Sequence, residues 1–376
     1  MLITLKSFSL LWLLCETTHV LALSTPPPSS SSSSTTTLPP NVFPSSTRQA
    51  LLQTQKYGRR GSYSAVGWSN RLGTVLTPVS VPGVYTADRP FYWNGIDVGC
   101  RMTMIELQQQ QSDDDKPVCW VHSPVGLDGP LLDALAQHDV RYVVSPNYEH
   151  VKFAPQWANA FPQAEMWGCP GLAAMKPNVP WKGEIPFGMR PPNNNNNHNH
   201  NNNNNNDQVL PWDDSSEIQS LHIDTEVNPF TGKPFFNEVV FYHVPSKTLL
   251  TTDLYWNYPS GDGVTNSFLR QQTSLVVEDT MANGPWELAP SVPPIPWGSR
   301  LWKVGMDKLF QPFYVNFMTQ DQERFRREIL RVLLEEWDIE TVIPAHGDIV
   351  RGKELIRSIL RQHFGLEDEQ KETTTK

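Results

Sequence analysis

Residues 236–253 read Phe-Asn-Glu-Val-Val-Phe-Tyr-His-Val-Pro-Ser-Lys-Thr-Leu-Leu-Thr-Thr-Asp, and this stretch decides the predicted fold. Its two apolar runs, Asn237–Val244 and Lys247–Thr252, flank a Pro-Ser pair, which is typical of a β-hairpin. On both sides of the hairpin, short apolar runs alternate with segments of helical spacing. The sequence therefore predicts an α/β domain built from layers of strands and helices.

The same patterns place further elements along the chain. The expected strands are Cys100–Leu107, Val118–His122, Val140–Val144, Ala164–Gly168 and Thr341–Ile343. The expected helices are Pro130–Gln137, a short one around Trp157, Asp321–Trp337 and Lys353–Phe364. Strands and helices that interleave in this way predict a single domain, which we place at residues 81–365.

The composition excludes several classes of protein. Hydrophobic residues make up 39% of the 376-residue chain and charged residues 18%, so a packed core is expected. The net charge of −9 argues against a nucleic-acid partner and disfavours anionic membranes. No apolar run reaches the about 20 residues of a membrane-spanning helix, so no integral membrane span is expected. The four cysteines have no C-x-x-C spacing, which argues against a cysteine zinc site.

The first 80 residues have the composition of a targeting sequence. Residues 1–24 contain Lys6 and a short apolar run, as signal peptides do. The following Ser/Pro-rich segment, 25–80, has no acidic residue, which is typical of organelle transit peptides. Together they predict plastid import through the secretory route; the alternatives are a disordered linker and a secreted or endomembrane product.

Two segments of biased composition carry no expected chemistry. The insertion 193–207 is rich in Asn and contains His198 and His200. Histidine-rich tracts can bind metal, but these two lie in a polar run without fixed geometry, so we expect a surface loop. Residues 366–376 form a polar tail.

The candidate chemistry lies in four short polar segments, each at the end of a predicted strand. They begin at His122, Ser145, Thr251 and Pro344, and read HSPVGLDG, SPNYEH, TTDLYWN and PAHGD. In α/β sheets, ligand sites form outside the carboxyl ends of strands. The imidazoles and carboxylates of the last three segments suit zinc, iron or manganese.

The order of these segments resembles the metallo-β-lactamase superfamily, which implies a four-layer αβ/βα sandwich. The chain resembles more closely one uncharacterised branch, domain of unknown function 4336, through WVHSPVGLDG at 120–129, WGCPGL at 167–172 and GSRLWKVGMDKLF at 298–310. Where the superfamily has His-x-His-x-Asp-His, this sequence has Ser145, Asn147, Glu149 and His150. One of the two metal sites has thus lost its histidines, and the resemblance implies one metal ion rather than two. The metal ligands that it implies are Glu149, His150, Asp253 and His346.

The resemblance further implies a hydrolase that depends on one divalent transition metal (Zn, Fe or Mn). Water activated by the ion would attack an ester, thioester, amide or phosphodiester of an unknown small molecule. Asp253, Asn147 and His122 are the expected catalytic residues, the last two as polar neighbours that orient water or substrate. The alternative is a catalytically inactive domain that binds a ligand or a partner. The sequence leaves the oligomeric state open.

Overall fold

The structure is a computed structural model that describes residues 58–59, 62–63, 67–69, 75–79, 81, 83–112, 115–191, 210–212, 217–258 and 295–366. The predicted signal peptide at 1–24, the Asn-rich insertion at 193–207 and residues 367–376 of the predicted tail lie outside the described residues. The segment 25–80 is described only in part. Within it, Trp68 and Ser69 are buried, and both backbone N–H groups donate to Oδ2 of Asp97.

The first large sheet of the described chain has the strand order β11-β10-β9-β8-β7-β4-β3. The bounds are β3 Thr77–Pro78, β4 Val84–Arg89, β7 Cys100–Gln111, β8 Pro117–His122, β9 Asp139–Ser145, β10 Glu165–Gly168 and β11 Trp181–Glu184. Strands β8 to β11 run parallel, so their carboxyl ends meet at one edge of the sheet. His122 and Ser145 end two neighbouring strands, and the segments that follow them therefore begin side by side.

The second large sheet has the order β12-β13-β14-β15-β16. The bounds are β12 Ile218–His222, β13 Val239–His243, β14 Thr248–Thr251, β15 Thr341–Pro344 and β16 Val350–Arg351. The predicted hairpin is confirmed as β13 and β14. Strands β14 and β15 are parallel and end opposite each other, at Thr251 and Pro344. Asp253 and His346 each follow two residues after these ends.

Alternation along the strands of the second sheet separates two hydrophobic cores. In β13, Val239 and Phe241 belong to a core that they share with the first sheet, whereas Val240 and Tyr242 belong to a core on the opposite face. Successive side chains of a strand point to opposite faces, so a run of buried apolar residues serves both cores. The second sheet is thus covered on both faces.

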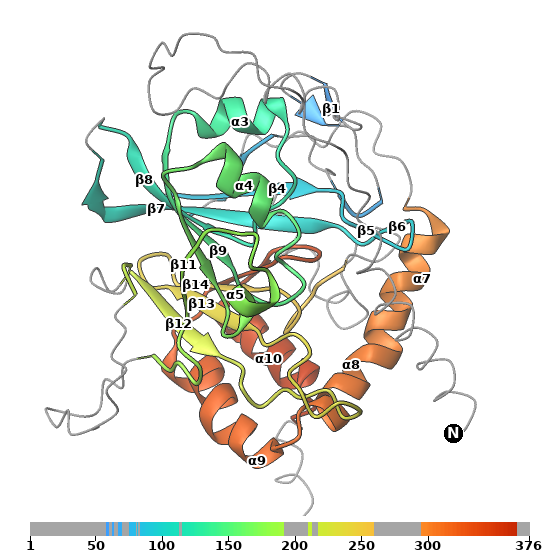
Figure 1. The fold of residues 1–376 in the computed structure, drawn as a ribbon. Helices are drawn as coiled ribbons and strands as arrows, with labels where there is room; N and C mark the ends of the chain where they lie inside the picture. Colours follow the sequence, from blue (N-terminus) through green and yellow to red (C-terminus); the bar gives the residue numbers. More distant parts are fainter. Residues whose placement is uncertain are drawn as a thin grey trace, which may run out of the picture. The chain divides into compact units, whose positions relative to one another are not determined.

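Helices cover the outer face of each sheet (Figure 1). The first sheet carries α3 Gly129–Leu135, α4 Ala154–Ala160 and α5 Leu172–Met175. The second carries α9 Gln322–Arg324, the wider π-type turns η5 Phe325–Leu330 and η6 Val332–Glu336, and α10 Lys353–His363. This helix–sheet–sheet–helix order confirms the expected αβ/βα sandwich of the metallo-β-lactamase type.

Small elements complete the described structure. The strands β1 Gly58–Arg59 and β2 Ser62–Tyr63 form one pair, and β5 Tyr92–Trp93 and β6 Ile96–Asp97 form another. A helical run that the sequence patterns do not predict comprises α7 Trp297–Gly305, η3 Met306–Phe310, α8 Gln311–Phe313 and η4 Tyr314–Met318. No helix in the described residues combines the length and apolar character that crossing a bilayer requires.

Candidate metal centre

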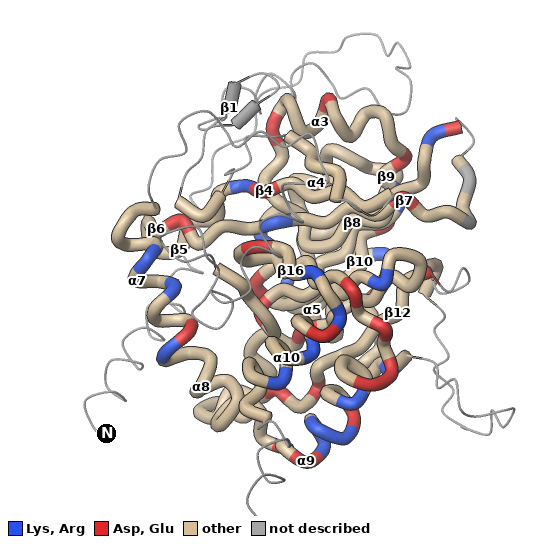
Figure 2. Tube along the Cα trace, turned by 180° about the vertical axis from the view of Figure 1, so that it is seen from behind, with Lys and Arg blue, Asp and Glu red and all other residues tan. Residues whose placement is uncertain are grey.

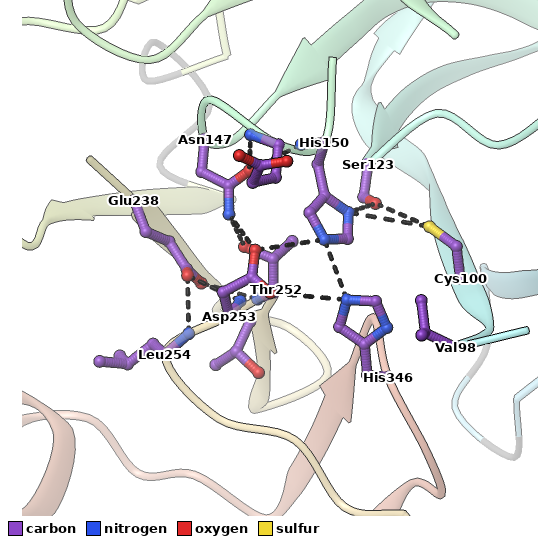
Figure 3. Close-up of polar contacts among 12 residues, drawn as sticks. Val98, Cys100, Ser123, Asn147, His150, Glu238, Thr252, Asp253, Leu254 and His346 are labelled. Atoms are coloured by element: carbon purple, nitrogen blue, oxygen red, sulfur yellow. Dashed lines mark hydrogen bonds and ion pairs between the residues drawn. The ribbon is translucent and has the colours of Figure 1, made fainter. Parts of the chain in front are cut away.

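Three side chains from the predicted ligand set meet at the junction of the two sheets. His150 follows β9 of the first sheet, whereas Asp253 and His346 follow β14 and β15 of the second. One ligand atom from each lies within 4.8 Å of the others, and all three residues are buried. Figure 3 shows the imidazoles of His150 and His346 and the carboxylate of Asp253 facing one another. Neither sheet alone forms this cluster.

The distances within the cluster suit a small cation. The Nε2 atoms of His150 and His346 are 3.1 Å apart. The carboxylate of Asp253 places Oδ2 3.4 Å from Nε2 of His150, and Oδ1 3.6 Å from Nε2 of His346. Ligand bonds of about 2.0–2.1 Å in tetrahedral geometry separate ligand atoms by about 3.3 Å. Three protein ligands with this spacing leave a fourth position for water or substrate.

Both imidazoles are held through their second nitrogen. Nδ1 of His346 donates to the carbonyl oxygen of Gly99 at 2.8 Å, which leaves Nε2 with its lone pair directed at the cluster. Nδ1 of His150 lies 2.7 Å from Oγ of Ser123 and 3.7 Å from Sγ of Cys100. Such outer contacts fix the tautomer and the ring orientation of metal-binding histidines. The Gly99 carbonyl therefore fixes both the tautomer and the ring orientation of His346, and Ser123 fixes the ring orientation of His150.

The carboxylate of Asp253 and its loop are held by two further side chains. Asn147 donates from Nδ2 to Oδ2 of Asp253 at 2.6 Å and to Oγ1 of Thr252 at 2.9 Å. The carboxylate of Glu238 accepts three backbone N–H bonds, from Thr252 (2.6 Å), Asp253 (2.8 Å) and Leu254 (2.7 Å). Glu238 therefore fixes the backbone of the loop, and Asn147 fixes the orientation of the carboxylate.

The loop that carries His346 is attached to the first sheet. Arg101, in β7, donates from Nη1 to the carbonyl oxygens of Pro344 and Gly347, and forms an ion pair with Asp88. Gly347 has a φ of +88°, and a Cβ atom at this position would lie 2.1 Å from the carbonyl oxygen of Asn257. A glycine is therefore required where this turn passes the Asn257 backbone.

Burial and mutual charge set the protonation of the cluster. Burial lowers the pKa of His150, although the charge of Asp253 acts in the opposite direction, so the imidazole is neutral at pH 7. For Asp253, burial raises the pKa, but His150 and His346 outweigh this effect and hold the pKa well below its usual range. A neutral imidazole beside an ionised carboxylate is the protonation state that a metal ion requires.

Three of the predicted site residues, Glu149, His122 and Asn147, lie outside the three-residue cluster. The carboxylate of Glu149 is not part of it; burial and the charge of Asp253 raise the pKa of Glu149 to about 7. His122 is buried and stacks on Trp120 at a ring distance of 6.0 Å. Burial lowers the pKa of His122 to about 3, and its Nε2 has no hydrogen-bond partner among the described residues.

Asn147 has a structural role that the sequence does not predict. Besides its two donated bonds, Oδ1 of Asn147 accepts the backbone N–H groups of Glu149 and His150 at 3.0 and 2.8 Å. Both the nitrogen and the oxygen of its side-chain amide therefore already have hydrogen-bond partners within the protein. Glu238 and Ser123 are not predicted from the sequence, although Glu238 has a signal: it is the one acidic residue in the stretch 235–244.

A surface pocket includes residues that are sequence neighbours of Asn147 and Glu238, although no member of the cluster lines it. It has a volume of 440 Å³ and is lined by residues that include Tyr148, Glu184, Phe187 and Asn237. Tyr148 directly follows Asn147, and Asn237 directly precedes Glu238. The backbone segments that hold Asp253 and His150 thus continue into the wall of this cavity.

The family follows from the sequence comparison. A sequence model of the family described as domain of unknown function (DUF4336) matches residues 83–281, more than half of the chain. The chain belongs to DUF4336. No protein among curated sequences matches the chain. The matched range of DUF4336 includes His150 and Asp253, and His346 lies beyond it.

Solved structures similar to this DUF4336 protein include metallo-β-lactamases and a flavodiiron core. The DIM-1 metallo-β-lactamase exposed to ceftazidime is 11% identical, with a TM-score of 0.40, over 77% of this chain and 94% of that one. A metallo-β-lactamase from Hirschia baltica is 9% identical, with a TM-score of 0.41, over 77% and 96%. The metal-soaked Flv1 flavodiiron core from Synechocystis sp. PCC6803 is 14% identical, with a TM-score of 0.44, over 77% and 60%. Similarities of this size carry no inference about activity.

Proposed function

We propose that this DUF4336 protein binds one divalent transition-metal ion at His150, Asp253 and His346 and uses it to hydrolyse a small molecule. The observation that carries the proposal is the buried cluster itself, in which three ligand atoms lie within 4.8 Å of one another. Two imidazoles and one carboxylate form a ligand set typical of catalytic zinc and non-haem iron sites. A bound ion would supply Lewis-acid activation of water or of a substrate oxygen.

The residues of the chain would prepare the site for this chemistry. Ser123 and the Gly99 carbonyl hold the histidine rings with Nε2 directed inward. Asn147 and Glu238 hold Asp253, so the ligands need no rearrangement before an ion binds. Burial of the cluster keeps bulk water away, which strengthens electrostatic interactions inside the site.

A surface pocket, whose lining includes the sequence neighbours of Asn147 and Glu238, supports a small organic substrate. Its 440 Å³ lies within the range of about 300–1,000 Å³ that is usual for ligand pockets. Proline, aromatic and aliphatic side chains line most of it, with Glu184 and Asn237 as polar groups. We propose that the substrate's non-reacting part occupies this cavity while its ester, thioester, amide or phosphodiester bond lies at the metal.

Elemental analysis tests the metal site. Protein purified without chelator is expected to contain about one transition-metal ion per chain. Asp253→Ala and His346→Ala should remove most of it, whereas Glu149→Gln should keep it, because the Glu149 carboxylate lies outside the cluster. Wild-type protein that stays metal-free after reconstitution with zinc, iron and manganese would refute the proposal. Metal content that survives both alanine variants would also refute it.

A second candidate is a non-catalytic ligand-binding domain. The observation that favours it concerns Asn147, a predicted catalytic residue. Its side-chain amide forms hydrogen bonds with Asp253, with Thr252 and with two backbone N–H groups, so it serves a structural role. Screening the metal-loaded protein with generic ester, thioester and phosphodiester substrates separates the two candidates. Turnover that the Asp253→Ala variant lacks supports the hydrolase. Ligand binding in the cavity without turnover, unchanged by metal removal, supports the binding domain.

A further inference from the structure

The inward face of α7 is fully used by the fold. Nε1 of Trp68 donates to the carbonyl oxygen of Ser299 at 3.0 Å, and Oγ of Ser299 donates to the carbonyl oxygen of Asp97 at 3.0 Å. One turn further, Nε1 of Trp302 donates to Oη of Tyr258 at 3.0 Å. These bonds fix how α7 is rotated about its own axis, and so determine which residues face outward.

The outward face of α7 carries large apolar side chains. Trp297, Leu301 and Val304 are 77%, 55% and 53% exposed. Their spacing of four and three residues places them in one stripe along the helix. Scattered exposed apolar residues are normal in soluble proteins, but a contiguous stripe with a tryptophan marks an interaction surface. Leu309 and Phe317, further along the same helical run, are also exposed.

The charges on this face are basic, although the whole chain is acidic. Arg300 and Lys308 are exposed, and neither forms an ion pair with any described residue. Lys303, at the side of the helix, pairs with Asp307. Basic positions along α7 are visible in Figure 2. The whole chain has a net charge of −9. The two cations beside the apolar stripe therefore give this face a local charge opposite in sign to that of the whole protein.

We propose that the outward face of α7, formed by Trp297, Arg300, Leu301, Val304 and Lys308, binds the surface of an anionic lipid bilayer. A helix that presents Trp and Leu together with Arg and Lys lies in the bilayer interface, its apolar side chains between the lipid headgroups. The basic side chains complement the negative surface of anionic lipids. Because salt screens the attraction between these basic side chains and the lipids, the binding is expected to weaken as the salt concentration rises.

A second copy of the chain is a less suitable occupant. In a two-fold symmetric dimer, the same patch meets itself, which brings Arg300 and Lys308 of one copy close to the same cations of the other. Like charges of this kind are unfavourable across an interface. An anionic lipid surface attracts these cations and creates no such repulsion. The proposal is independent of the metal centre, since none of its residues is a member of the ligand cluster His150, Asp253 and His346.

Vesicle sedimentation with the full chain tests the proposal. The vesicles contain either phosphatidylcholine alone or phosphatidylcholine with 30% phosphatidylglycerol, at low and high salt. The expected result is binding to the anionic vesicles alone, with release at high salt. Arg300→Gln with Lys308→Gln should weaken binding about 25-fold, since each basic group near an anionic surface contributes about fivefold. Trp297→Ser with Leu301→Ser should weaken it more than about tenfold.

Matched variants elsewhere on the surface serve as controls. Lys182→Gln with Arg326→Gln removes the same charge, and Met175→Ser with Phe187→Ser removes two exposed apolar side chains. Binding should be unchanged by the apolar control and changed less than twofold by the charge control. Equal losses in the control and α7 variants would overturn the proposal, as would a wild-type protein that ignores anionic vesicles. Light scattering that finds a dimer dissociated by the α7 variants would instead assign this face to a second copy.

Discussion

Glu238 offers the sharpest test of how the site is built. Its Oε1 accepts the backbone N–H of Thr252, and its Oε2 accepts those of Asp253 and Leu254. In the variant Glu238→Gln, one oxygen can still accept two of these bonds, but the amide NH2 then faces the third N–H group. A buried donor without an acceptor costs about 1–3 kcal/mol. We expect the free energy of unfolding, measured by urea denaturation, to fall by that amount.

The effect on metal binding should exceed the effect of lost stability alone. Displacing the loop of Asp253 misplaces one ligand, and loss of an outer-shell partner typically weakens metal affinity about 10- to 100-fold. The affinity is measured by zinc titration against a chromophoric chelator, under conditions in which circular dichroism shows the variant to be folded. A variant that binds zinc as tightly as the wild type would refute this reasoning.

Glu226 provides a closely matched control. It is buried like Glu238, its Oε1 accepts the N–H of Phe235, and its Oε2 accepts those of Phe236 and Asn237. The same pattern of three bonds therefore holds a loop without a metal ligand. Glu226→Gln should lose about the same 1–3 kcal/mol of stability while keeping its zinc affinity. Equal loss of affinity in both variants would show that the effect is one of general destabilisation.

Four further predictions concern pH, the core, the Asn-rich insertion and the leader. Burial lowers the pKa of His363 to about 4, so this residue contributes stability above pH 6.5 that is lost as the pH falls towards 4. In urea unfolding, His363→Gln should narrow the stability difference between pH 7 and pH 5 by about 2 kcal/mol, and an unchanged difference contradicts this. Phe241→Ala, in the core between the sheets, should cost about 3–5 kcal/mol, whereas Phe187→Ala, 69% exposed, should cost far less, and equal costs would contradict the core assignment. Deletion of residues 193–206 should leave the melting temperature and the metal content unchanged, since the run has no apolar surface to bury; a large loss of either would refute this. Residues 1–80 fused to a fluorescent protein should direct it to plastids, and accumulation in the medium or cytosol would exclude a bipartite leader.

The sequence predicts the large elements well because the apolar residues of each element recur with the clear spacing of a strand or a helix. The two strands of the hairpin and the helix at 321–337 are found close to their predicted bounds. The helical run Trp297–Met318 has no such signal, because Gly298, Gly305 and Pro312 lower its helix propensity. Its stability comes from contacts with Trp68 and Tyr258, which are distant in the sequence and leave no local pattern.

For the site, strand ends are predictable and side-chain directions are not. His150, Asp253 and His346 could be grouped because each follows a strand end. Spacing alone cannot tell which of the adjacent residues Glu149 and His150 faces Asp253, since the turn between them depends on Asn147. The roles of Ser123 and Glu238 rest on contacts across the fold, which a single sequence does not reveal.

The order of strands along the chain has a consequence for fragments of this protein. Every strand of the seven-stranded sheet, up to β11, precedes the Asn-rich insertion, and every strand of the five-stranded sheet follows it. His150 therefore belongs to one half of the polypeptide, and Asp253 and His346 belong to the other. Two polypeptides divided within the insertion would each carry an incomplete set of ligands. Metal binding would then report their reassembly, as in a complementation assay.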